Sequence, residues 1–479
     1  MHATFYALLL LSSYLSGAFA NLDSSRKKGF KLPIHRVARV NRRESADSVT
    51  ISNANEFSYL VHLGIGGQYF RLILDTGSSD MWVVSDECDL EGCKSVDRYS
   101  QSSSKSLSVS RKPFHVDYLK GSVGGLIAFD TVSIGPYEIN SQIFGLVNVA
   151  KDMNFASGGN SGILGLSFAT EAAIPIKSGS TILQNIFAYI EDPFFAFKLG
   201  RNSGPNTTSS FTFGQLDSTY ASDTSPFLIT PVSQAGANDY SFWKLPLQSI
   251  IVNNSTVPLS PSSVRGVYEG QIAVLDTGTT LALGPTADVD SFWAMIGPDA
   301  RYNGMNGMWE MRCNKAVNVQ FVLGDKDAHR AFMMDYTDVS WAEGHSDGGW
   351  CMGGIQANDN VDSGDWLLGD VFLRNVYSIH HGGNLTHPPF IGLMSTVNQS
   401  SALADFRASR GPDLGSDSQP TLRPHIHGAV EKGPSLAAPT LYSLAAACGF
   451  VAGAAVTTLF RARRVFRLGK YSKEKAVSL

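Results

Sequence analysis

The feature that most constrains this chain is a short motif that occurs twice. Residues 72–79 read LILDTGSS, and residues 273–280 read AVLDTGTT. In each copy an apolar run ends in a carboxylate and continues into a turn that contains glycine and hydroxyl residues. This pattern predicts a buried strand followed by a tight turn. Two matched copies indicate an internal duplication, and hence a chain that folds as two related halves.

The two loops predict a pair of carboxylates, Asp75 and Asp276, that face each other in one site. Two carboxylates held so close cannot both ionise, so one pKa rises and the pair shares a proton. The ionised group can then take a proton from water while the protonated group gives one to a carbonyl oxygen. The hydroxyls of Ser78 and Thr279 are suited to hydrogen-bond the carboxylates.

The other residues of the two loops are predicted to shape and brace them. Glycine lets the backbone turn sharply, which assigns that role to Gly77 and Gly278. Thr76 and Thr277 are expected to hold the loops in place. The simpler interpretation, in which each aspartate only caps a turn, suits a single copy better than two matched copies.

Four further motifs carry a resemblance to a known family. They are DMWVVS at 80–85 with Trp82, VDYLKGS at 116–122 with Tyr118, GILGL at 162–166 and WLLGD at 366–370. With the two aspartate loops, they make the chain resemble a pepsin-type aspartic endopeptidase from about Tyr59 to Val397. The resemblance implies an all-β, bilobal fold with a central cleft, in which Tyr118 sits on a flap hairpin and interacts with Trp82.

The cysteines are consistent with this interpretation but do not fix their own pairing. Four of the five lie in the body of the chain, and four thiols allow three connectivities. The resemblance implies one pair in each lobe, Cys88 with Cys93 and Cys313 with Cys351. No cluster of cysteine and histidine has metal-binding spacing, so we expect neither a metal nor another cofactor. His380 and His381 are expected to be solvated near a loop.

The charge distribution is strongly asymmetric. Residues 21–43 carry eight Lys/Arg and one Asp, residues 461–479 carry seven Lys/Arg and one Glu, and the whole chain has a net charge of −4, which leaves −17 for residues 44–400. An acidic body argues against nucleic-acid binding. It suits a protein that works in acid, where protonation brings its charge towards zero.

The N-terminal region predicts export and processing. Residues 1–20 have an apolar centre and end in an A-x-A site, which predicts a signal peptide, although no Lys or Arg precedes the apolar run. The basic residues 21–43 resemble a propeptide, and Arg42-Arg43 predicts cleavage by a dibasic-specific processing protease. The N-terminal lobe is placed at 44–225 and the C-terminal lobe at 226–400.

The C-terminal region predicts a membrane anchor. Residues 401–440 are rich in Ser, Pro, Gly and Ala, as in a stalk or linker. Residues 441–460 carry no charge and are long enough to cross a bilayer. The basic tail 461–479 is predicted to be cytosolic by the positive-inside rule. A GPI anchor is the alternative, but its signal would end with the apolar stretch.

These features predict a monomeric, single-pass type I membrane protein of the secretory pathway, at the cell surface or on a vacuolar or endosomal membrane. The family features look compatible with a fungal source. N-glycosylation sequons begin at Asn206, Asn253, Asn254, Asn384 and Asn398.

The resulting functional prediction is an aspartic endopeptidase that hydrolyses polypeptides by water activation at Asp75 and Asp276, with an acid pH optimum. The alternative is a catalytically inactive, membrane-tethered binding protein with the same fold, because a fold alone does not fix a function.

Overall fold

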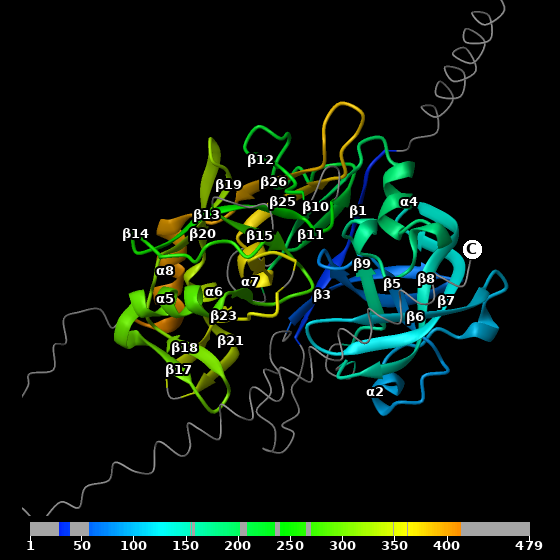
Figure 1. The fold of residues 1–479 in the computed structure, drawn as a ribbon, viewed down its shortest axis with the longest axis horizontal. Helices are drawn as coiled ribbons and strands as arrows, with labels where there is room; N and C mark the ends of the chain where they lie inside the picture. The colour runs from blue at the N-terminus through cyan, green and yellow to red at the C-terminus, as the bar shows by residue number, and fades with distance from the viewer. Residues whose placement is uncertain are drawn as a thin grey trace, which may run out of the picture. The chain divides into compact units, whose positions relative to one another are not determined.

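The computed structural model describes residues 28–38, 57–153, 155, 159–201, 208–234, 240–264, 270–347, 349–361 and 363–412. All of them lie in one compact unit, Met1–Ser418. Figure 1 shows that this unit is built mainly from β-strands, with short helices around them. The all-β class predicted from the sequence is confirmed.

The strands of the first half of the chain are β1 (Phe30–Leu32), β2 (Ile34–Ala38), β3 (Phe57–Ile65), β4 (Gln68–Asp75), β5 (Met81–Val84), β6 (Ser108–Asp117), β7 (Ser122–Ile134), β8 (Tyr137–Lys151), β9 (Gly162–Gly165), β10 (Phe194–Lys198) and β11 (Ser210–Phe213). Those of the second half are β12 (Leu228–Pro231), β13 (Lys244–Val252), β14 (Ser255–Thr256), β15 (Gln271–Leu275), β16 (Ala282–Gly284), β17 (Ala300–Asn303), β18 (Met308–Arg312), β19 (Val319–Asp325), β20 (Ala328–Met334), β21 (Ser340–Asp347), β22 (Trp350–Gly353), β23 (Ile355–Ala357), β24 (Trp366–Leu368), β25 (Val376–His381) and β26 (Phe390–Ser395).

The helices are short. They are α2 (Glu91–Lys94), α4 (Ile182–Tyr189), α5 (Thr286–Ile296), α6 (Tyr336–Val339), α7 (Asp370–Leu373) and α8 (Gln399–Arg410), with 3-10 turns η1 (Gln101–Ser103), η2 (Ala169–Glu171), η3 (Ile176–Ser178) and η4 (Gly297–Asp299). Local sequence explains where some of them begin. Thr181 and Gln184 form a reciprocal capping box at the start of α4, and the Asn398 side chain caps α8.

The internal duplication is visible in the strand order of the two lobes. In the N-terminal lobe, β4, β9, β5 and β8 are consecutive neighbours of one sheet. In the C-terminal lobe, β15, β24, β16 and β23 repeat this arrangement. In both sets the first and last pairs are parallel and the middle pair is antiparallel. The two DTG motifs and the two later apolar-Gly motifs therefore occupy equivalent positions.

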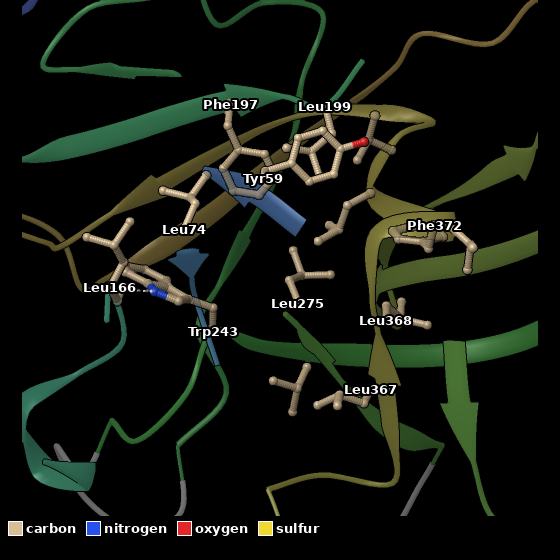
Figure 2. Close-up of a cluster of buried hydrophobic side chains, with 14 of the residues drawn as sticks. Tyr59, Leu74, Leu166, Phe197, Leu199, Trp243, Leu275, Leu367, Leu368 and Phe372 are labelled. Atoms are coloured by element: carbon tan, nitrogen blue, oxygen red, sulfur yellow. Dashed lines mark hydrogen bonds between the residues drawn. The ribbon is translucent and has the colours of Figure 1, made fainter. Parts of the chain in front are cut away.

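A six-stranded sheet joins the two halves of the chain. Its order is β1-β11-β10-β25-β26-β12, so three adjacent strands of the first half are followed by three adjacent strands of the second half, and β10 pairs with β25 where they meet. One large hydrophobic cluster runs across both lobes around it, and smaller clusters lie beside it. Figure 2 shows the part of this core that contains Leu74 and Leu275, the residues directly before the two aspartates. Packing of Trp243 and Leu166 there, with a hydrogen bond of 2.8 Å from Trp243 Nε1 to the Leu166 carbonyl, ties the two lobes together.

Both predicted disulfides are present. Cys88 and Cys93 are joined beside α2, with 6.0 Å between their Cα atoms. Cys313 and Cys351 are joined beside the four-stranded sheet β17-β18-β22-β21, with 4.9 Å between their Cα atoms.

Several predictions concern residues that the structure does not describe. These are the signal peptide 1–20, the cleavage site Arg42-Arg43, most of the stalk, the transmembrane segment 441–460 and the tail 461–479. Among the described residues, none of the helices has the length and hydropathy that a membrane span requires.

The segment around residue 400 differs from the prediction. Helix α8 begins at Gln399, and its Phe406 side chain is fully buried against Tyr336 of the C-terminal lobe. The boundary between lobe and stalk, predicted at residue 400, therefore falls inside a packed helix. The composition of 401–440 did not reveal this, because the apolar residues that hold α8 are few and widely spaced.

Candidate active site

Each aspartate of the repeated motif stands at the end of a central buried strand. Asp75 is the last residue of β4 and lies beside Gly165 of the parallel strand β9. Asp276 directly follows β15, and its backbone amide donates to the carbonyl of Leu368 on the parallel strand β24 at 3.1 Å. The strands that carry the GILG and WLLG motifs thus lie directly beside the strands that end in the two aspartate loops. This explains why each half of the sequence contains one motif of each kind.

Each carboxylate is held by its own loop through one backbone and one hydroxyl donor. Asp75 accepts from the Gly77 amide at 2.8 Å and from the Ser78 hydroxyl at 2.5 Å. Asp276 accepts from the Gly278 amide at 2.7 Å and from the Thr279 hydroxyl at 2.6 Å. The two sets of donors match atom for atom, so both carboxylates have one fixed orientation.

The two threonines that follow the aspartates lock the loops to each other. The Thr76 hydroxyl donates to the Leu275 carbonyl at 2.8 Å, and the Thr277 hydroxyl donates to the Leu74 carbonyl at 2.7 Å. Each hydroxyl also accepts from the backbone amide of the other threonine, at 3.1 and 3.0 Å. All four bonds join the two lobes, so the geometry of the site depends on both.

The glycines of the two loops let the carboxylates approach each other. A Cβ atom at Gly77 would lie 2.4 Å from Oδ1 of Asp276, and one at Gly278 would lie 2.4 Å from Oδ1 of Asp75. Each glycine therefore borders the aspartate of the opposite loop, where no side chain fits.

The carboxyl groups of Asp75 and Asp276 are in hydrogen-bond contact and are almost completely buried. Burial, followed by the negative charge of Asp276, raises the pKa of Asp75 to about 8. Burial also raises the pKa of Asp276, against the hydrogen bonds from Thr279 and Gly278. Both shifts have the direction expected of two buried carboxyl groups in contact, which favour sharing a proton over ionising together.

Tyr118 lies at the tip of the hairpin formed by β6 and β7. The tip is closed by a hydrogen bond of 3.0 Å from the Tyr118 amide to the Gly121 carbonyl, and Gly121 has a φ of +80°. The Trp82 indole nitrogen donates to the Tyr118 hydroxyl at 2.7 Å. Burial, together with the charge of Asp75, raises the pKa of Tyr118, so its hydroxyl stays protonated. The structure thus brings Tyr118, Trp82 and Asp75 together.

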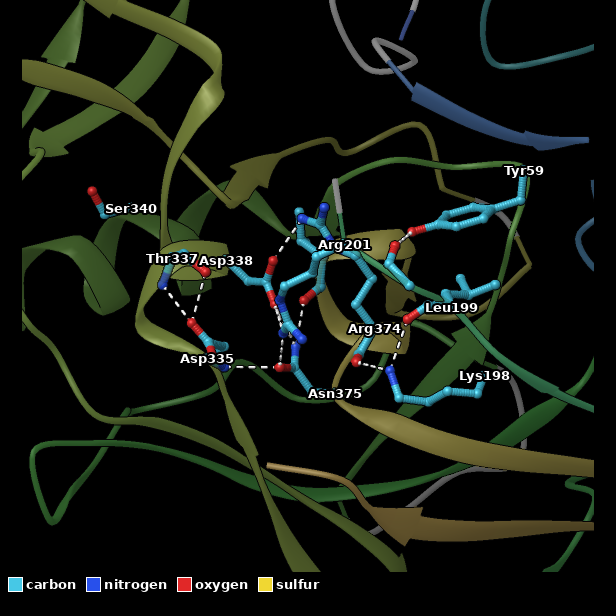
Figure 3. A network of polar contacts seen from close by, with 12 residues as sticks. Tyr59, Lys198, Leu199, Arg201, Asp335, Thr337, Asp338, Ser340, Arg374 and Asn375 are labelled. Carbon is cyan, nitrogen blue, oxygen red and sulfur yellow. Dashed lines mark hydrogen bonds and ion pairs between the residues drawn. The ribbon is translucent and has the colours of Figure 1, made fainter. Parts of the chain in front are cut away.

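A charged network at the junction of the two halves was not found from the sequence (Figure 3). Buried Asp338 forms ion pairs with Arg201 and with Arg374, the latter at 2.6 Å. Lys198, also buried, donates to the backbone carbonyls of Leu199 and Arg374, at 2.7 Å each. Its members come from β10 and the segment that follows it, from α6 and from the end of α7, which are far apart in the sequence. No local pattern could have identified them.

The expectation of solvated histidines at 380 and 381 is wrong. Both lie on β25 and are buried. The His380 ring stacks on Phe195 with 4.7 Å between ring centroids, and burial lowers its pKa to about 3. His381 Nε2 lies 2.9 Å from Asp192 Oδ1.

The predicted glycosylation sites differ in their surroundings, and their use stays a prediction. Asn253 and Asn254 form the exposed turn between β13 and β14, both with positive φ. Asn384 lies in an exposed turn after β25, and Asn398 caps α8. Asn206 lies outside the described residues.

The class that this fold and site define is the aspartic proteases. The chain matches the family model for eukaryotic aspartyl proteases over residues 57–386, and it belongs to this family. It is an aspartic-type endopeptidase, a hydrolase.

Individual relatives agree with this assignment. The chain is 28% identical to pepsin A of Bos taurus over 352 residues, which is 71% of this chain and 87% of that protein. It is 29% identical to an aspartic protease of Phaffia rhodozyma, over 74% of this chain and 80% of that protein. It is 27% identical to major aspartyl peptidase 1 of Cryptococcus neoformans var. grubii, over 78% of this chain and 75% of that protein.

Proposed function

We propose that this endopeptidase cleaves peptide bonds with a water molecule activated by Asp75 and Asp276. The observation that carries the proposal is the contact between these two buried carboxyl groups, each held by a backbone amide and a hydroxyl of its own loop. Such a pair can act as a general base and a general acid at the same time.

The reaction would proceed in two stages. The ionised carboxylate takes a proton from water as the water oxygen attacks the peptide carbonyl carbon, and the protonated carboxyl gives its proton to the carbonyl oxygen. The resulting tetrahedral diol then breaks its C–N bond. One proton passes to the leaving nitrogen and one hydroxyl proton returns to the dyad, so that the site regains its single shared proton. No covalent enzyme intermediate and no cofactor is needed.

The hairpin tip at Tyr118 is proposed to close over an extended polypeptide lying across the dyad, in a cleft between the lobes. Its hydrogen bond to Trp82 supports this role because it fixes the tyrosine ring beside Asp75. A closed hairpin would exclude water other than the reacting molecule and would hold the substrate in register.

An acid pH optimum is part of the proposal. The dyad works with one shared proton, so activity should be lost once that proton dissociates above the raised pKa of Asp75, and the preference for acid itself is inferred from the charge of the chain. The acidic charge of residues 44–400 supports the same conclusion, because repulsion among carboxylates diminishes as they are protonated.

We further propose that the chain enters the secretory pathway through residues 1–20, is processed after Arg43 and is anchored as a single-pass type I protein by residues 441–460. The sequence patterns described above support this location, as do the two disulfides, which persist in oxidising compartments.

The decisive experiment compares the purified full-length chain with Asp75→Asn and Asp276→Asn variants on a peptide library across pH 3–8. We expect cleavage with an acid optimum, inhibition by a pepstatin-type inhibitor, and a loss of activity of at least about 10³-fold in each variant. A wild-type chain that binds the inhibitor but cleaves no peptide at any pH would favour the alternative of an inactive binding protein.

A further inference from the structure

The segment 28–38, which belongs to the predicted propeptide, is part of two β-sheets. Strand β1 pairs with β11 at the edge of the six-stranded sheet, with Phe30 opposite Phe213. Strand β2 pairs with β3 at the edge of the N-terminal sheet, with Ile34 opposite Val61. Pro33 separates the two strands and lets the chain pass from one sheet to the other. Figure 1 shows β1 running alongside the strands of the shared sheet.

Three side chains of this segment are inserted in the hydrophobic core. Phe30, Leu32 and Ile34 are 6%, 4% and 7% exposed. The Phe30 ring stacks on Phe213 at 5.2 Å and meets the edge of Tyr137 at 4.9 Å. Alternation of buried and exposed residues along β1 matches the pleat of a sheet that covers a core on one face.

The exposed face of β1 carries an ion pair with a buried carboxylate. The Lys31 ammonium contacts Asp217, whose side chain is 7% exposed. The same carboxylate accepts from the Ser210 hydroxyl at 2.5 Å and from the Thr219 amide at 3.1 Å. At the other end of the strand, the Tyr137 hydroxyl donates to the Lys28 carbonyl.

Acid should not break this ion pair. Burial by itself would raise the pKa of Asp217, but the hydrogen bonds from Lys31, Ser210 and Thr219 outweigh it and hold the pKa well below its usual range. The other titratable groups that face Asp217 are the phenols of Tyr220 and Tyr377, which are uncharged in acid. Asp217 therefore stays ionised at pH values where an ordinary aspartate becomes protonated.

The predicted cleavage site lies in the connection between two paired strands. Residues 39–56 join β2 to β3, which are antiparallel neighbours over five residue pairs. A cut within such a connection breaks the chain but removes none of the strand pairing, ion pairing or core contacts on either side of it.

We infer that residues 28–38 remain bound after processing, as a non-covalent strand shared by the two sheets of the mature enzyme. The partner that this sheet edge fits is thus an extended peptide with the sequence pattern aromatic-basic-aliphatic, supplied by the chain itself. The inference rests on the proposed cleavage near Arg43, and it makes the mature enzyme a two-chain molecule.

The test uses the full-length chain with a recognition sequence for a specific protease replacing residues 44–50, so that the cut can be made at will. The cut protein is passed through a native desalting column at pH 4.0 and pH 7.0, then denatured and weighed by mass spectrometry. We expect the N-terminal peptide in equal amount to the body at both pH values. Loss of the peptide from a cut protein that stays folded would overturn the inference. This holds equally if the residues that follow the cut take the place of the peptide in the sheet.

Two matched variants test whether the Lys31–Asp217 ion pair holds the cleaved peptide in place. Lys31→Met removes the ammonium but keeps the aliphatic stem, and should release the peptide at least tenfold faster at pH 4.0. Lys28→Met removes an exposed ammonium and keeps the carbonyl that Tyr137 binds, so it should release the peptide at the wild-type rate. Equal rates in the two variants would contradict the role of the Lys31–Asp217 pair. Peptide cleavage is assayed separately: an inactive protein that retains the strand would refute the proposed hydrolysis and leave this inference standing.

Discussion

Thr76 and Thr277 each donate a hydroxyl hydrogen bond to the opposite loop and accept one from the other's backbone amide. Both side chains are buried, with at most 1% exposure. The same two residues thus bind the lobes together and set the separation of the aspartates that precede them. Stability and catalytic geometry are coupled at this point.

Replacing Thr277 by Val, which has nearly the same shape, should therefore reduce both the stability of the protein and its catalytic activity. It leaves the Leu74 carbonyl and the Thr76 amide buried without partners, which we expect to cost about 2–4 kcal/mol in free energy of unfolding. Denaturant unfolding of the full chain measures this, and peptide cleavage should fall in parallel. Thr277→Ser keeps the hydroxyl and should cost less than about half as much. Equal losses in the two variants would show that packing of the methyl group matters more than the hydrogen bonds.

Substitution of Gly77 by Ala should damage catalysis more than stability. The new methyl group would collide with the Asp276 carboxylate, 2.4 Å away, and push the two carboxyl groups apart. We expect kcat to fall by about 100-fold, because small displacements of reacting groups are that costly. Gly304→Ala is the matched control, since a Cβ atom there meets nothing within 4 Å. A Gly77→Ala enzyme with wild-type kcat would mean that the loops can adjust without loss.

The residues of the dyad could be predicted because they lie in a local motif that is repeated. The sequence LDTG places an aspartate, a hydroxyl and a glycine in one turn, and its duplication predicts that Asp75 meets Asp276. The pairing of Tyr118 with Trp82 is similarly marked by the short motifs around each residue. Both pairings are present in the structure.

The remaining features depend on contacts between distant segments. Asp338 meets Arg201 across 137 positions and lies on a short helix that has no distinguishing pattern. His380 is buried because Phe195 and Trp243 cover its ring. Its neighbour in the sequence is the polar residue His381, so the local sequence does not predict this burial. The strands of residues 28–38 likewise take their partners from β11 and β3. Such pairings are set by the tertiary fold, so neither composition nor periodicity reveals them.

The dyad should make the protein less stable as pH rises. The pKa of Asp75 is about 8 in the folded protein and close to 3.9 in an unfolded chain, so the folded state binds more protons between these values. Its contribution to stability is present below about pH 4 and is lost as pH rises through 8, by a few kcal/mol in total. Thermal melting of the full chain from pH 4 to pH 8 should show this decline.

The Asp75→Asn variant isolates the cause, because asparagine has the same shape and does not titrate in this range. Its melting temperature should change less between pH 4 and pH 8 than that of the wild type. Asp290→Asn, at an exposed position of α5, is the control and should keep the wild-type slope. If the Asp75→Asn curve parallels the wild type, the decline comes from other groups.

Neutralising Asp338 alone should greatly lower the free energy of unfolding, because this carboxylate lies at the centre of a buried charged network. Burial alone would raise the pKa of Asp338, but the charges of Arg201 and Arg374 lower it below its usual range, so the carboxylate is ionised in the working range of the enzyme. Asp338→Asn would remove the buried carboxylate that pairs with two guanidinium groups at the lobe junction. Breaking a buried ion pair in this way costs about 3–5 kcal/mol.

The matched control is Asp299→Asn. Asp299 pairs with Lys315 at 3.2 Å, but both side chains are more than one-fifth exposed, so the loss should be under about 1 kcal/mol. Denaturant unfolding at pH 5 measures both variants.

Because Arg374 and Lys198 connect the network to the shared six-stranded sheet, Asp338→Asn should also make the two lobes unfold in separate steps. A single transition with less than about 1 kcal/mol of destabilisation would mean that solvent or neighbouring groups compensate the two arginines, and that the network does not hold the lobes together.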